Sequence, residues 1–194
     1  MKRTLYPYLL LMAAILLFQS ANAQRTIRMN IERMVSDAAM IVHGTVTNVE
    51  TGADPQTNII STTVTITVIE NFYGADQSTV IIKMVGGKTN RKTVKFAEMP
   101  VFTIGEEIYS LFFAPSKYGF TSPVGMGQGK FTVQTDANTH KKVVRNTVNN
   151  ARLFANMKNV SALSSSSIST TNESMIGAED FSKTIRSLVT ILKK

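Results

Sequence analysis

The chain has 194 residues, with 21 lysines and arginines against 13 aspartates and glutamates, a formal net charge of +8, and neither cysteine nor tryptophan. The lack of cysteine excludes disulfides, thiolate zinc sites and cysteine nucleophiles, so an ordinary buried core must stabilise the fold. With only two histidines, the chain cannot build a three-histidine metal site.

The first residues have the pattern of a secretory signal peptide. Lys2 and Arg3 precede an apolar run over residues 9–18, and Ala-Asn-Ala at 21–23 offers a small-residue cleavage site. As a helix this run would cover about 15 Å, against a bilayer core of about 30 Å, which argues against a membrane anchor. We therefore expect residues 1–23 to be removed and the product to be periplasmic or secreted, without stable membrane insertion.

The periodicity of apolar residues then predicts one short helix followed by strands. Residues 27–41 place Ile27, Ile31, Met34, Val35 and Ala38 on one helical stripe. Next, "MIVHGTVTNVE" and the alternating run "IISTTVTITVIE" predict two strands joined by the turn "TGADPQTN". A third strand is expected at "STVIIKMV", and a long loop at "GGKTNRKTVKFAEMPVFTIGEE", with a short strand around residues 93–96. The remaining strands are expected at "EIYSLFFAPS", "FTSPVGMGQGKFTVQT" and "KKVVRNTV", the last two joined by the turn "DANTH".

About seven short strands after one helix favour a single small antiparallel β-barrel or sandwich. We expect this β-barrel domain over residues 24–157, a Ser/Thr-rich linker over 158–176 and a tethered amphipathic helix over 177–194. The apolar face of that last helix is a candidate partner-binding surface, formed by Phe181, Ile185, Leu188 and Leu192.

The stretch "VGMGQGKFTV" raises the question of whether a nucleotide binds there. A Walker loop needs Ser or Thr after Gly-Lys, but Gly129-Lys130 is followed by Phe131. A dinucleotide fingerprint needs a different glycine spacing, since Gly125, Gly127 and Gly129 are each two residues apart. Alternate glycines on a strand permit close packing or a sharp bend. We therefore predict a structural role for them and no cofactor.

Several segments resemble a group of uncharacterised secreted bacterial proteins. The resemblance rests on "SDAAMIVHGTVTNVE", "VIENFYG", "VGG", "FTIGEEIYSLFF" and "GMGQGKFTV", and spans roughly residues 34–144. These proteins look like small OB-like barrels, similar in outline to the netrin and metalloproteinase-inhibitor module. The inhibitors act through an N-terminal cysteine, whereas this chain would start at Gln24 after cleavage. The resemblance thus implies a fold and a compartment but no inhibitory residue.

Catalytic patterns are weak. Glu106 and Glu107 are adjacent, and neighbours in a strand point to opposite faces, so they cannot flank one bond. His43 is expected within a strand, and neither a Gly-x-Ser-x-Gly elbow nor a His-Glu-x-x-His helix occurs. The sequence predicts a non-catalytic protein. The alternative, an unrecognised hydrolase, would need a cleft that gathers His43 or His140 with carboxylates.

The excess of positive charge gives the remaining hypothesis. Two basic sets would form a polyanion-binding surface, for polysaccharide or nucleic acid, if they converged on one face. They comprise Lys83, Lys88, Arg91, Lys92 and Lys95, and Lys141, Lys142 and Arg145. Our first hypothesis is nevertheless a binding module that contacts another exported protein, and polyanion binding is the alternative.

Overall fold

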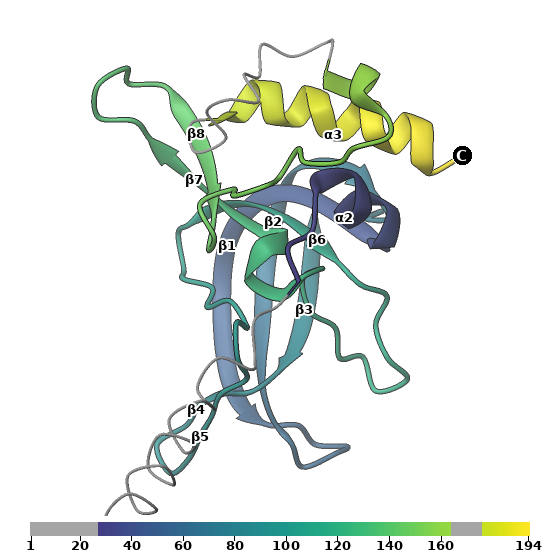
Figure 1. Cartoon of the computed structure of the whole chain (residues 1–194). Helices are drawn as coiled ribbons and strands as arrows, with labels where there is room; N and C mark the ends of the chain where they lie inside the picture. The colour runs from purple at the N-terminus through teal and green to yellow at the C-terminus, as the bar shows by residue number, and fades with distance from the viewer. Residues whose placement is uncertain (1–26, 164–175) are drawn as a thin grey trace, which may run out of the picture.

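The computed structural model describes residues 27–163 and 176–194, and Figure 1 shows their arrangement. The expected signal peptide and most of the expected linker lie outside these residues. The helices are α2 (Ile31–Asp37) and α3 (Ala178–Leu192), with 3-10 turns η2 (Met126–Gly129) and η3 (Val160–Leu163). The strands are β1 (Met40–Ala53), β2 (Ile60–Tyr73), β3 (Thr79–Val85), β4 (Gly87–Lys88), β5 (Thr93–Val94), β6 (Glu107–Phe112), β7 (Lys130–Thr135), β8 (Lys142–Asn146) and β9 (Ile176–Gly177).

Seven strands form one antiparallel sheet in the order β3-β2-β1-β6-β7-β8-β9, and β4 pairs with β5 in a separate hairpin. The long strands β1 and β2 pair from Ile41–Tyr73 to Ala53–Ile60, with three register shifts that bend the pair. Gly44 lies at one shift, where an added Cβ would be 2.4 Å from the Thr67 carbonyl oxygen. The mainly β architecture with two flanking helices confirms the expected fold class in outline.

The sheet has an apolar core on each of its two faces, since alternate residues of β6 belong to different cores. The first lies beneath the helices and includes Met34, Leu111, Phe131 and Ile185. The second lies inside the curve of β1, β2, β3 and β6 and includes Val64, Ile82 and Phe112. Figure 1 shows α2, α3 and the β7–β8 hairpin at one end of the long strands and β4–β5 at the other.

Residues 120–124 touch two strands that are not neighbours in the sheet order. The amide of Thr121 donates to the carbonyl oxygen of Lys83 in β3 at 2.9 Å. The amide of Val124 donates to the carbonyl oxygen of Leu111 in β6 at 2.8 Å, and a bridge joins Phe112 to Pro123. Among the described residues these contacts are isolated bridges rather than a strand ladder, and no closed barrel is defined.

Two hairpins of the sheet use the same turn chemistry. In the β1–β2 turn, Asp54 Oδ1 accepts hydrogen bonds from the amide and hydroxyl of Thr57, at 2.9 and 2.8 Å. In the β7–β8 turn, Asp136 Oδ1 accepts the same two bonds from Thr139, both at 2.8 Å. Each turn then has a residue with positive φ, Asn58 or His140. The repeated Asp-x-x-Thr pattern is therefore a local hairpin signal.

Helix α2 covers only Ile31–Asp37, whereas the apolar stripe predicted a helix over residues 27–41. Asn30 caps its N-terminus, since its side-chain oxygen accepts from the Arg33 amide at 2.9 Å. Ile27 lies outside the helix and is exposed. Glu32 is buried, and its carboxylate accepts a hydrogen bond from the backbone amide of Lys158 at 2.5 Å.

The glycine-rich stretch is a turn, which corrects the expectation that its glycines alternate along a strand. Gly125 has φ +68, η2 follows at once, and β7 begins only at Lys130. The predicted close packing is present, because an added Cβ would meet Thr147 at Gly127 and the backbone of Val124 at Gly129. A tight backbone turn against a neighbour explains the glycines without a phosphate.

Helix α3 is docked on the sheet, which corrects the expectation of a tethered helix with a free apolar face. Phe181, Ile185 and Leu188 are fully buried in the first core, and Leu192 packs against it. The Lys193 ammonium donates to the carbonyl oxygens of Ser36 and Ala38, at 2.8 and 2.6 Å. The helix face serves the chain's own core because the sheet presents an apolar surface to it.

Candidate functional site

The two basic sets lie at opposite ends of the molecule. Lys88, Arg91, Lys92 and Lys95 belong to the β4–β5 hairpin, whereas Lys141, Lys142 and Arg145 belong to the β7–β8 hairpin (Figure 1). The two basic sets therefore do not converge into one shared polyanion-binding surface. Chain topology decides this, since the two hairpins continue opposite ends of the sheet.

Lys83 and Lys142 form ion pairs with acidic side chains of the same chain. Lys83 Nζ lies 2.6 Å from Asp54 Oδ2, on a carboxylate that is almost fully buried. Lys142 Nζ lies 2.6 Å from Glu107 Oε2. Each of these charges is offset within the chain, so neither adds fully to an external field.

By contrast, the β4–β5 hairpin concentrates charge without acidic partners. We refer to Lys88, Arg91, Lys92 and Lys95 as the basic hairpin. All four are exposed, and within residues 27–163 and 176–194 none of them forms an ion pair. No acidic residue occurs between Lys83 and Lys95. This end of the molecule thus carries a local positive potential.

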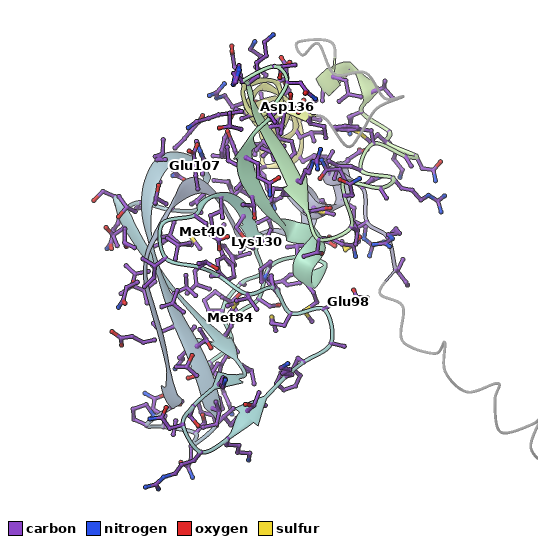
Figure 2. The ribbon with its side chains drawn as sticks, turned by 90° about the vertical axis from the view of Figure 1, so that its left-hand side faces the viewer. Met40, Met84, Glu98, Glu107, Lys130 and Asp136 are labelled. Atoms are coloured by element: carbon purple, nitrogen blue, oxygen red, sulfur yellow. The ribbon has the colours of Figure 1, made fainter. Side chains whose placement is uncertain are left out.

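An apolar hollow of about 450 Å³ opens beside the basic hairpin, and we call it the main hollow because it is larger than the one that adjoins it. A hollow of about 700 Å³ lies elsewhere, between the start of α2 and residues 152–159. The main hollow continues the second core outward, and Figure 2 shows Met84 in this half of the molecule, between the long strands and the loop that carries Glu98. Its lining residues are Val49, Thr51, Thr62, Met84, Val85, Gly86, Gly87, Lys88, Val94, Lys95, Phe96, Met99, Pro100, Val101 and Phe102.

The few polar side chains in this lining, apart from the lysines, bond to each other or to the backbone. Thr51 Oγ1 and Thr62 Oγ1 are 3.0 Å apart, and the Thr62 hydroxyl donates to the carbonyl oxygen of Gly86 at 2.8 Å. At Gly87, φ is +138 and an added Cβ would lie 2.4 Å from Thr62 Oγ1. This glycine therefore lets β4 cross closely over β1 and β2 and form one wall of the hollow.

A hollow of about 400 Å³ adjoins the main hollow, since Val85, Phe96 and Met99 line both. Large apolar side chains are exposed around them, with Phe96 at 49%, Val101 at 78% and Phe113 at 39% of full exposure. We call Phe96, Met99, Val101 and Phe113 the loop patch. The sequence predicts a long loop over residues 86–107, which contains Phe96, Met99 and Val101, and a strand that contains Phe113.

A buried lysine holds the loop that carries the patch. Lys130 Nζ lies 2.6 Å from Glu106 Oε1 and donates to the Val101 carbonyl oxygen at 2.7 Å. The same ammonium lies 4.8 Å from the centre of the Phe102 ring. The loop is thus attached to β7, which keeps Val101 at the rim of the main hollow.

His43 contacts Glu107 and Tyr109, and this group lies apart from the two adjoining hollows. His43 Nε2 is 2.9 Å from Glu107 Oε1, and the His43 ring stacks on Tyr109 at 4.1 Å between centroids. Burial opposes ionisation of Glu107, but hydrogen bonds from Lys142 and His43 outweigh it and lower the pKa of this carboxyl. His140 lies in the β7–β8 turn, where its amide donates to the carbonyl oxygen of Asp136. His43 therefore meets a carboxylate, but neither residue lines a hollow described above.

The adjacent carboxylates have separate partners. Glu106 pairs with Lys130, and Glu107 with His43 and Lys142. In the described ranges, no cluster of three or more potential metal-ligating side chains occurs, and no helix is long and apolar enough to cross a bilayer.

Comparison with protein-family models, with curated proteins and with solved structures finds no match to this chain.

Proposed function

We propose that the chain is an exported, non-catalytic binding module that contacts another exported protein through the loop patch. The observation that carries this proposal is the exposure of Phe96, Val101 and Phe113 around two adjoining apolar hollows. Exposed apolar side chains gathered around hollows are typical of protein interaction sites. We expect the protein to be exported because residues 1–23 have the pattern of a signal peptide.

We further propose an OB-like barrel as the scaffold. Residues 120–124 would close it, since they bond to β3 through Lys83 and to β6 through Leu111. In this arrangement β3, β2, β1 and β6 surround the second core, and the main hollow is the open mouth of the barrel. Barrel mouths are common binding positions because several loops converge there.

The protein-binding proposal predicts partner capture that depends on the loop patch and little on salt. Tagged mature protein is used to capture partners from its native envelope fraction at low and high salt. Because the contact is apolar, Val101→Ser with Phe113→Ser should lose at least 80–90% of the captured partner, roughly the effect of 1–2 kcal/mol. The matched control changes two exposed isoleucines outside the patch, Ile69→Ser with Ile81→Ser, and should retain it. Equal capture by both double variants would refute the loop patch as the binding site.

Polyanion binding through the basic hairpin alone is the second candidate, favoured by its unpaired charges. It predicts retention on heparin that falls steeply with salt and is lost in Arg91→Gln with Lys92→Gln. Capture that disappears at high salt, with no effect of the patch variants, would favour this candidate over protein binding.

A further inference from the structure

The main hollow has the chemistry of a site for an aliphatic chain. Its volume of about 450 Å³ lies within the usual range for small-ligand sites, about 300–1,000 Å³. Its inner walls include Val49, Met84 and Phe102, which extend the apolar second core. The lining hydroxyls of Thr51 and Thr62 already have hydrogen-bond partners. An apolar ligand would therefore leave no lining hydroxyl unpaired.

The rim of the same hollow is positively charged on one side. Lys88 and Lys95 are both lining residues, one in β4 and the other directly after β5. Their long side chains can cover apolar surface while the ammonium groups stay in water. Arg91 and Lys92, in the turn between the two strands, add positive charge beside them. A ligand matched to this site has an apolar body and an anionic end.

We propose that the main hollow binds a single-chain anionic amphiphile, with its aliphatic chain against Val49, Met84 and Phe102 and its head group between Lys88 and Lys95. The charge complementarity favours a carboxylate or a similar anion over a neutral or cationic head. This inference goes beyond the contact with an exported protein proposed above and does not depend on it. An aliphatic chain in the hollow would lie beneath Val101, which forms part of its rim.

The chain has no tryptophan, so Phe96→Trp places a single indole reporter at the mouth of the hollow. This variant is titrated with laurate, decanoate and dodecyltrimethylammonium, each below its micelle-forming concentration, and calorimetry on the unchanged protein checks the result. We expect saturable binding of laurate. Decanoate should bind about tenfold more weakly, since each buried CH₂ changes the affinity about three- to fourfold. The cationic amphiphile should bind at least tenfold more weakly than laurate, because its head group meets the lysines.

Two further variants in the Phe96→Trp background separate the chain site from the head-group site. Val49→Phe fills the hollow and should weaken laurate binding at least tenfold. Lys88→Gln with Lys95→Gln should remove the preference for the anion but keep the dependence on chain length. The charge-matched control, Lys141→Gln with Lys158→Gln, changes exposed lysines outside the hollow and should bind laurate normally.

Absence of saturable laurate binding to the unchanged protein would overturn the proposal. So would equal affinities for laurate and the cationic amphiphile, or unchanged affinity in a folded Val49→Phe variant. Thermal unfolding of each variant without ligand shows whether it is folded.

Discussion

At the scale of single residues, Asp54 connects a turn to a strand. One of its carboxylate oxygens accepts hydrogen bonds from Thr57, and the other pairs with Lys83 of β3. Hydrogen bonds from Lys83 and then from Thr57 lower the pKa of Asp54 to about 2, against an ordinary value of 3.8. Asp136 makes the same turn, and its pKa is lowered mainly by hydrogen bonds from Thr139.

The lowered pKa of Asp54 predicts how the stability of the protein depends on pH. Because the pKa of Asp54 is lower in the folded protein, its stabilisation is fully present above pH 3.8 and is lost as the pH falls toward about 2. Urea unfolding measured from about pH 5 to about pH 2 should show a steeper loss for the unchanged protein than for Asp54→Asn. Other carboxylates titrate equally in both proteins, so the difference isolates Asp54. Parallel curves would show that ionisation of the Asp54 carboxyl contributes nothing to stability in this pH range.

At the scale of elements, the β4–β5 hairpin depends on two glycines. The chain leaves β3 through Gly86 and Gly87, both with positive φ, and folds over the ends of β1 and β2. The hairpin itself has only two residues in each strand. Its position therefore depends on the close contact between Gly87 and the Thr51–Thr62 pair more than on its own hydrogen bonds.

Gly87→Ala should displace the hairpin and alter the main hollow. The new methyl group would overlap Thr62 Oγ1, and alanine also disfavours a φ of +138. We expect a destabilisation of about 1–3 kcal/mol by urea unfolding, with faster hydrogen exchange in the hairpin. The control is Gly52→Ala, since no atom lies within 4 Å of an added Cβ there. That change should stay within about 0.5 kcal/mol, and a similar loss in both variants would contradict the proposed role of Gly87.

At the scale of the whole molecule, α3 completes the domain rather than extending from it. Its buried face covers the first core together with α2, and Tyr109 of β6 meets Ser182 of α3 at 2.9 Å. Arg186 forms a two-pronged contact with Glu70 of β2, at 2.6 and 2.9 Å. The helix is thus joined to the sheet by apolar packing, a hydroxyl pair and an ion pair.

Docking of α3 predicts that it unfolds with the sheet. Ile185→Ala removes a fully buried side chain and should destabilise the protein by about 2–4 kcal/mol, with helix and sheet signals lost in one transition. Ile191→Ala, at a more exposed position of the same helix, should cost less than about 1 kcal/mol. A separate early transition for the helix, or no effect of Ile185→Ala, would instead indicate a tethered element.

Local patterns in the sequence predicted most of the strands. The alternation of Val, Ile and Thr along residues 60–69 predicted β2, and the segments "TGADPQTN" and "DANTH" predicted the turns of the two hairpins. The glycine stretch was predicted to pack closely, but its 3-10 turn was missed. A spacing of two is compatible with either a strand or a compact turn when each residue is glycine.

What the sequence by itself determined is therefore the class of fold, the strands and their turns, because these depend on side-chain period and on neighbours within a few residues. Only the tertiary structure decided which surfaces remain free. It separated the two basic sets to opposite ends of the sheet, buried the face of α3, and built a hollow from the aperiodic loop after β3. Such outcomes depend on contacts between residues far apart in the chain, which no local period encodes.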